Sequence, residues 1–99
     1  MVAKWKIIYT KDAVKDSLKI ARSHLKEKVE KLLEIIRQDP YGNPPPYEKL
    51  TGDLKGFYSR RINLQHRLIY QILEPQKIIK VVSMWSHYGK TKSGVGMLT

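Results

Sequence analysis

Side chains in the second half of the chain have the chemistry needed to cleave RNA through its own 2′-hydroxyl group. That reaction requires a base for the 2′-hydroxyl proton, an acid for the departing 5′-oxygen and cations for the phosphorane. Glu48 is a candidate base, and His87 is a candidate acid because a histidine titrates near neutral pH. DNA lacks the internal nucleophile, so such a set would select RNA. The candidate cations are Arg60, Arg61 and Arg67. Arginine suits this role because its planar guanidinium group can hold two phosphate oxygens at once.

Each of these residues also has an ordinary structural explanation. A glutamate beside a proline-rich turn is usually solvated, and Arg67 can form a cross-strand ion pair with Glu48. Arg60 and Arg61 can make surface salt bridges, and as neighbours on a strand they point to opposite faces, so at most one can face a given ligand. Tyr88 can be a packed aromatic residue at the sheet margin. A histidine at a strand end is more often structural than catalytic, and two further histidines are expected to be structural or on the surface: His24 and His66.

The elements that must position these residues begin with a strand and two helices. Alternation of apolar residues predicts a strand over 5–9, and a period near 3.6 predicts a helix over 11–22 capped by Thr10. A second helix is predicted up to Asp39-Pro40, with Ser23 as its N-cap. The residues expected to face the core are Val14, Leu18 and Ala21 on the first helix and Leu25, Val29, Leu32, Leu33 and Ile36 on the second.

The pattern changes after the helices. Residues 40–47 form a segment rich in Pro and Gly and are predicted to be a connector. From Phe57 the apolar period becomes two, which predicts strands over 57–63, 66–73 and 77–87. Helices followed by an antiparallel meander indicate an α+β domain in which the helix pair covers one face of the sheet and leaves the other free. We expect residues 1–88 to form this domain and residues 89–99 to be a flexible tail.

Composition limits the function classes. The 99 residues include 19 Lys and Arg against nine Asp and Glu, and this charge of +10 favours a polyanionic partner. Residues 47–99 carry nine basic and three acidic side chains, so the sheet half is the better candidate for an anion-binding surface. A hydrophobic content of 41% excludes a disordered or fibrous chain.

Other kinds of site are excluded by residues that are missing. The chain has no cysteine, which excludes a disulfide framework, a thiolate metal site and a thiol nucleophile. No acidic pair at metal-ligand spacing accompanies His87, so we expect neither a metal nor another cofactor. No apolar run is long enough to span a membrane and the start lacks a signal-peptide pattern, so a cytoplasmic protein is expected.

A run of motifs from Tyr47 to Tyr88 resembles the YoeB (Txe-like) branch of the RelE toxin superfamily. The resemblance extends over nearly the whole chain, from the first strand to Tyr88. The motifs occur together and at the sequence spacings that are typical of the family, which is improbable by chance. They are Glu48, a Leu-x-Gly, Ser59-Arg60-Arg61-Ile62, His66-Arg67-Leu68 and the terminal His87-Tyr88.

The resemblance implies a fold, an activity and partners. It implies two helices on a curved antiparallel sheet, and a ribosome-dependent mRNA endonuclease that cuts the codon in the A site and stops translation. The implied partners are mRNA and rRNA on the ribosome and a YefM/Axe-like antitoxin, with operator DNA bound only through the antitoxin complex. Glu48 would be the base, His87 the acid, Arg67 the phosphate ligand, and Tyr88 would orient reacting groups. The RNA-binding residues would be Arg60, Arg61 and Lys55.

A function of another class remains open. A domain of charge +10 binds nucleic acid in a salt-sensitive way without any catalysis, because binding releases counterions. The alternative is therefore a non-catalytic RNA- or ribosome-binding module. The set of Glu48, Arg67 and His87 separates the two, since a pure binder needs no base and acid together.

Overall fold

The computed structural model describes residues 4–85, so the expected domain end at residue 88 and the expected tail over 89–99 lie outside the described residues. Two helices and a short 3₁₀ helix accompany a five-stranded sheet. In chain order the elements are β1 (Lys6–Tyr9), α1 (Lys11–Ala21), α2 (Lys26–Gln38), β2 (Glu48–Lys49), η1 (Gly52–Leu54), β3 (Phe57–Arg61), β4 (Arg67–Leu73) and β5 (Ile78–Ser83).

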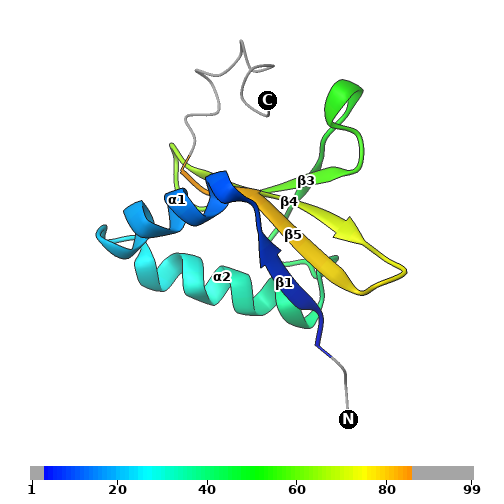
Figure 1. Cartoon of the computed structure of the whole chain (residues 1–99), viewed down its shortest axis with the longest axis horizontal. Helices are drawn as coiled ribbons and strands as arrows, with labels where there is room; N and C mark the ends of the chain where they lie inside the picture. Colours follow the sequence, from blue (N-terminus) through cyan, green and yellow to red (C-terminus); the bar gives the residue numbers. More distant parts are fainter. Residues whose placement is uncertain (1–3, 86–99) are drawn as a thin grey trace.

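The sheet has the strand order β1-β5-β4-β3-β2. β5, β4, β3 and β2 are antiparallel neighbours, whereas β1 pairs in parallel with β5. Figure 1 shows α1 and α2 together on one side of this sheet. The predicted α+β class, with the helix pair on one face, is confirmed. The parallel β1 is placed beside β5 because the α1–α2 hairpin carries the chain across the sheet before the meander begins.

α1 begins where the sequence predicts, but it buries a different face. The Thr10 side chain accepts a hydrogen bond from the Ala13 amide at 3.1 Å, as expected of an N-cap. The side chains of Ala13 and Ile20 are buried, whereas those of Val14 and Leu18 are 48% and 58% exposed. The predicted core face of α1 is therefore wrong. The Thr10 amide donates to the Val81 carbonyl of β5, and this link fixes the rotation with which the helix leaves the sheet.

The start of α2 also differs from the prediction. Its N-cap is Leu25, which has no side-chain capping bond. Ser23 instead lies in the turn between the helices, where its hydroxyl donates to the Ile20 carbonyl and accepts from the Leu25 amide. The apolar stripe of α2 is confirmed, because four of its five predicted residues are buried. These are Leu25, Val29, Leu32 and Ile36, while Leu33 is half-buried.

The core lies between the helices and one face of the sheet. Alternate residues of β4 and β5 point into it, as the period of two requires. The largest contributions from the sheet side come from Leu68, Tyr70, Ile79 and Val81, with Trp5 and Ile62 at its margins. None of the helices in residues 4–85 is long and apolar enough to cross a lipid bilayer.

The strands are shorter than predicted because the turns occupy more residues. The Asn63 side chain accepts hydrogen bonds from the Gln65 and His66 amides, so the turn spans 62–66 and β3 ends at Arg61. At the next turn, Lys77 has a φ of 57° and its amide donates to Glu74, which delays the start of β5 to Ile78.

Candidate active site on the helix-free face

Three of the predicted site residues lie on the face of the sheet that the helices leave uncovered. Register pairs Glu48 of β2 with Ser59 of β3, and Arg61 of β3 with Arg67 of β4. Paired residues share a face, and so do residues two apart on one strand, so these four side chains project together. The opposite face carries Leu68 and Tyr70 of the core.

Arg67 is the centre of this group. Its Nη1 atom donates to Glu48 Oε1 at 3.1 Å and to Ser59 Oγ at 3.0 Å. The Arg67 side chain is 18% exposed, whereas that of Glu48 is 63% exposed. The guanidinium is thus held by the sheet, while the carboxylate reaches it from solvent. The cross-strand ion pair that sequence analysis raised as an alternative for Arg67 does form.

This ion pair contributes little to the stability of the fold. An exposed salt bridge is worth about 0–1 kcal/mol, because water screens the charges and two side chains lose freedom. The Glu48 side chain can therefore leave Arg67 at small cost. A ligand with a phosphate group can take its place, since the guanidinium binds phosphate oxygens as well as carboxylate oxygens.

A shallow hollow of about 240 Å³ adjoins the pair. Its lining includes the exposed Arg61, so two guanidinium groups and one carboxylate face the same small volume. Low volume and charged walls suit a phosphodiester and its neighbouring ribose better than an apolar ligand. The lining residues are Pro46, Tyr47, Glu48, Ser59, Arg61 and Arg67.

Glu48 is positioned by a hairpin that sequence analysis missed. The two-residue β2 pairs with β3, and the Leu50 amide donates to the Phe57 carbonyl where the hairpin closes. The loop between the strands needs glycine, since Gly52 and Gly56 have φ values of 66° and 98°. Two residues are too few to show a period of two, so the strand gave no periodic signal. Ser59 was missed as well, because a serine within a strand has no distinguishing pattern.

Arg60 corrects the predicted set of RNA-binding residues. Its side chain is fully buried on the helix side of the sheet, opposite to Arg61. Its Nε donates to the Tyr70 hydroxyl at 2.9 Å, Nη2 donates to the Pro40 carbonyl at 3.0 Å and Nη1 donates to the Pro45 carbonyl. A guanidinium with these partners is not available to RNA, so the expectation is wrong for Arg60. The expectation that only one of the two arginines can face a given ligand agrees with this arrangement.

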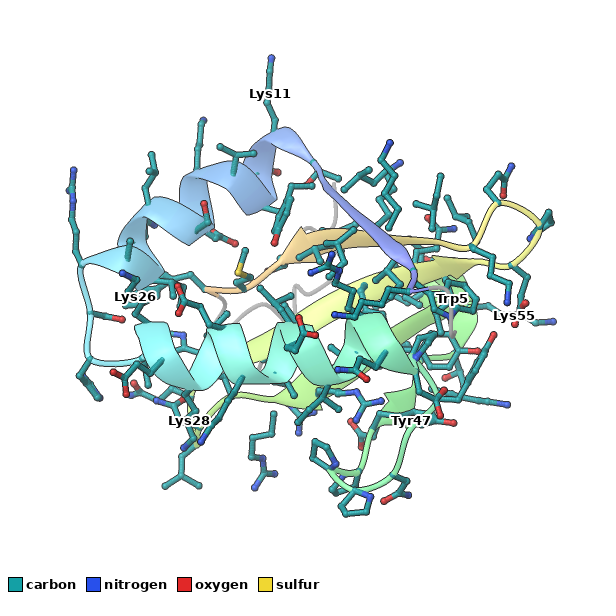
Figure 2. The ribbon with its side chains drawn as sticks, turned by 90° about the horizontal axis from the view of Figure 1, so that it is seen from below. Trp5, Lys11, Lys26, Lys28, Tyr47 and Lys55 are labelled. Atoms are coloured by element: carbon teal, nitrogen blue, oxygen red, sulfur yellow. The ribbon has the colours of Figure 1, made fainter. Side chains whose placement is uncertain are left out.

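The buried Arg60 holds the connector that leads to Glu48. Both carbonyls that accept from it belong to the connector, and the ring of Tyr47 lies 5.0 Å from its guanidinium carbon. Figure 2 shows Tyr47 on this connector, beside the sheet. Tyr47 directly precedes Glu48 in the chain. Arg60 therefore fixes the segment from which the carboxylate projects.

Four tyrosines surround this part of the connector. Tyr58 contacts the rings of three others, with centroid distances of 5.6–6.1 Å. Burial raises the pKa of the Tyr70 hydroxyl, and the hydrogen bond from Arg60 opposes that increase. Partial burial, and donation to the Glu74 carboxylate at 2.6 Å, raise the pKa of Tyr41 well above its ordinary value. The hydroxyls of Tyr41 and Tyr70 therefore serve as hydrogen-bond donors, to the Glu74 carboxylate and the Pro40 carbonyl. The other members of the cluster are Tyr41, Tyr47 and Tyr70.

Lys55, among the remaining predicted residues that the structure describes, does not line the hollow. Lys55 is exposed and follows η1, in the loop that precedes β3. His87 and Tyr88 lie outside the described residues. His66 is buried and stacks on Trp85, and His24 is exposed, in agreement with the structural or surface roles expected of them. Within residues 4–85, no three His, Cys, Asp or Glu side chains are grouped so that they could hold a metal ion.

The fold is similar to that of solved bacterial toxins. A YoeB/ParE toxin from Agrobacterium tumefaciens is 27% identical, with a TM-score of 0.77 over 84% of this chain and 99% of that one. The toxin in a YoeB–YefM complex from Staphylococcus aureus is 32% identical, with a TM-score of 0.72 over 87% of this chain and 100% of that one. The fold class is therefore that of small bacterial toxins of the YoeB and RelE kind.

Sequence similarity makes the assignment more specific. A toxin YoeB from Streptomyces coelicolor is 34% identical over 76 residues, which is 75% of this chain and 90% of the relative. The model of the YoeB-like toxins of bacterial type II toxin–antitoxin systems matches residues 9–88. The chain belongs to this family, as its motifs predicted.

Proposed function

We propose that this toxin is a ribosome-dependent endoribonuclease that cleaves mRNA in the A site. In this proposal Glu48 removes the 2′-hydroxyl proton and His87 protonates the 5′-oxygen. Arg67 neutralises the phosphorane, and Tyr88 orients the reacting groups. Arg61 and Lys55 bind the RNA backbone. Translating ribosomes lie in the cytoplasm, so the toxin acts there.

The observation that carries the proposal is the shared guanidinium of Arg67, between Glu48 and Ser59. When a phosphate binds Arg67, it displaces the Glu48 carboxylate, which then has no cationic partner at that position. The displaced carboxylate lies beside the bound phosphate, where a base for the 2′-hydroxyl is needed. Ser59 still accepts from Arg67 and keeps the guanidinium in place during this exchange.

The sheet register supports a role for the residues that follow β5. Ser83, Ile69, Ser59 and Glu48 are laterally paired across β5, β4, β3 and β2. Three strand spacings correspond to about 14 Å between Ser83 and Glu48. His87 comes four residues after Ser83 in the sequence. Four residues of chain span at most about 14 Å, so the imidazole has the reach to approach a phosphate bound at Arg67.

The test is cleavage of a defined mRNA on programmed ribosomes. We expect Glu48→Gln and His87→Gln each to lower the single-turnover rate by about a hundredfold or more, because each removes a proton-transfer group. Ribosome binding should be retained, which can be measured by co-sedimentation. The exposed Lys49→Gln, next to Glu48 on β2, is the matched control. If both site variants cut mRNA at the wild-type rate, the assignment of base and acid is wrong.

The same experiment addresses the non-catalytic alternative. A pure RNA- or ribosome-binding module would co-sediment with ribosomes, as the charge of +10 favours, yet would leave the mRNA intact. Intact mRNA with the wild-type chain would support that alternative. A cut that depends on Glu48 would exclude it.

We further propose that an antitoxin of the YefM/Axe kind neutralises this toxin. A Staphylococcus aureus relative has been solved as a YoeB–YefM complex, which supports the proposal. An acidic segment of the antitoxin would cover Arg61 and Arg67, and operator DNA would be bound through the complex. Co-expression of the neighbouring gene should relieve growth arrest, and Arg61→Glu should weaken the complex. Growth arrest that no neighbouring gene relieves would contradict this proposal.

A further inference from the structure

An acidic residue of α1 holds the end of β5. The Oδ2 atom of Asp16 accepts two hydrogen bonds, from the Met84 amide at 2.9 Å and from the Trp85 amide at 3.2 Å. These two amides come directly after Ser83, where β5 ends and the chain bends. Nearly seventy residues separate the carboxylate from the amides, so this is a long-range tertiary contact and not a local turn.

Hydrogen bonds to an ionised carboxylate are roughly twice as strong as neutral ones. One carboxylate oxygen that accepts from two consecutive amides also fixes the direction of the peptide between them. Asp16 therefore fixes the orientation of the peptide between Met84 and Trp85, directly after β5, beyond adding to the packing of α1.

A second contact, made by the side chain of Trp85, holds the same part of the chain. The ring of Trp85 stacks on the ring of His66, with centroids 4.3 Å apart and planes 26° apart. His66 is buried and directly precedes Arg67 of the site. Trp85 is thus held through its amide by α1 and through its ring by the residue next to Arg67.

His87 follows this anchored residue at a distance of two positions. Two residues of chain span at most about 7 Å, so an anchored Trp85 restricts the volume that the imidazole can reach. No sequence pattern marks Asp16 as functional, and it does not line the hollow beside Arg67.

We propose that Asp16 is a positioning residue for His87, an inference that rests on the proposed nuclease function. By binding the Met84 and Trp85 amides, the carboxylate directs the chain so that the imidazole meets the leaving 5′-oxygen. The effect passes through the backbone, and Asp16 itself contacts no RNA. A displacement of about 1 Å in such a group can cost about a hundredfold in rate.

The test compares full-length variants in single-turnover cleavage of mRNA on ribosomes. Asp16→Ala removes the acceptor and should lower the rate by about tenfold to a hundredfold, without a change in ribosome binding. Asp16→Asn keeps an oxygen that can accept from both amides but loses the charge that strengthens these bonds, so it should lower the rate only severalfold. Asp12→Ala and Asp12→Asn, in the first turn of the same helix and exposed, are the matched controls and should behave as wild type.

A purely structural role is distinguished by a double-mutant cycle with His87. If Asp16 acts through the imidazole, Asp16→Ala should cause no further loss in the His87→Gln background. A loss of the same size in both backgrounds would overturn the proposal, as would a wild-type rate for Asp16→Ala.

Thermal unfolding measured for each variant shows whether the compared proteins are folded. If Asp16→Ala does not fold, the cleavage rate of Asp16→Asn tests the proposal instead. A severalfold loss that vanishes in the His87→Gln background supports the proposal, and a rate equal to that of Asp12→Asn overturns it. Absence of cleavage by the wild-type chain would overturn the proposed function, and this inference with it.

Discussion

Arg60 and Arg61 are neighbours in the chain, yet their side chains have opposite environments. Arg61 is exposed at the hollow, and Arg60 is buried against Tyr70 and two connector carbonyls. The alternation along a strand predicts that they differ. It does not predict which one is buried, because that depends on where the connector passes. A buried arginine also contradicts the general preference of this residue for the surface, so sequence alone assigned both to RNA.

We expect substitutions of these two arginines to differ in their effect on the free energy of unfolding. Arg60→Met removes three hydrogen bonds and leaves buried acceptors unsatisfied, so it should lower the free energy of unfolding by about 3 kcal/mol. Arg61→Met should change it by no more than about 0.5 kcal/mol, because the residue is exposed. Urea unfolding measures both. Equal loss of stability in the two variants would contradict the assignment of Arg60 as the buried anchor of the connector.

Ser59 provides a second test at the level of single residues. Ser59→Ala removes the hydroxyl that accepts from Arg67, so the guanidinium loses one of the acceptors that hold it in place. We expect the single-turnover cleavage rate to fall by about tenfold, equivalent to about 1.4 kcal/mol. Ser17→Ala, which removes the hydroxyl of a serine on α1, is the control. A wild-type rate for Ser59→Ala would show that this hydroxyl does not position Arg67.

At the scale of elements, the sequence patterns predicted α1, α2 and the three-stranded meander, but not which face of α1 is buried. α1 has apolar residues on two sides, with Ala13 and Ile20 on one and Val14 and Leu18 on the other. Periodicity alone assigns the large Val14 and Leu18 to the core, and this assignment is wrong. The small Ala13 is fully buried where α1 packs on the sheet, and the face that packs cannot be predicted from the helix sequence alone.

The two faces of α1 should therefore respond differently to truncation. Ile20→Ala leaves a cavity in the core and should cost about 2–5 kcal/mol of unfolding free energy. Leu18→Ala, on the face that is exposed in this chain, should change stability by no more than about 0.5 kcal/mol. Thermal or urea unfolding of the two variants checks the result. A larger loss for Leu18→Ala would mean that the exposed face is covered in solution.

On the scale of the whole molecule, the positive charge lies on both the helices and the sheet. Figure 2 shows Lys11 and Lys28 pointing away from α1 and α2. Arg61 and Arg67, in contrast, line the hollow on the helix-free face of the sheet. Net charge alone predicts affinity for polyanions but not which side binds them. The helix pair on one face of the sheet, together with the register of β2, β3 and β4, leaves Arg61 and Arg67 together on the helix-free face, where we propose that RNA binds.

Salt dependence should distinguish the two sides. Each phosphate contact contributes about one to the slope of the logarithm of the binding constant against the logarithm of salt concentration. We expect Arg61→Gln to reduce this slope by about one in ribosome binding, and Lys11→Gln to leave it unchanged. Binding isotherms at several salt concentrations provide the measurement. A reduced slope for Lys11→Gln with an unchanged slope for Arg61→Gln would place the RNA on the helices and contradict the proposed binding site.

The central claim is that the RNA is cut by its own 2′-hydroxyl, with Glu48 as base and Arg67 holding the phosphate. The most direct test uses mRNA with a single 2′-deoxy nucleotide at the scissile position of the A-site codon. We predict that the toxin binds ribosomes programmed with this mRNA but does not cut it. The unmodified mRNA should give a 2′,3′-cyclic phosphate and a 5′-hydroxyl end. Cleavage of the deoxy-substituted position at the normal rate would contradict the account.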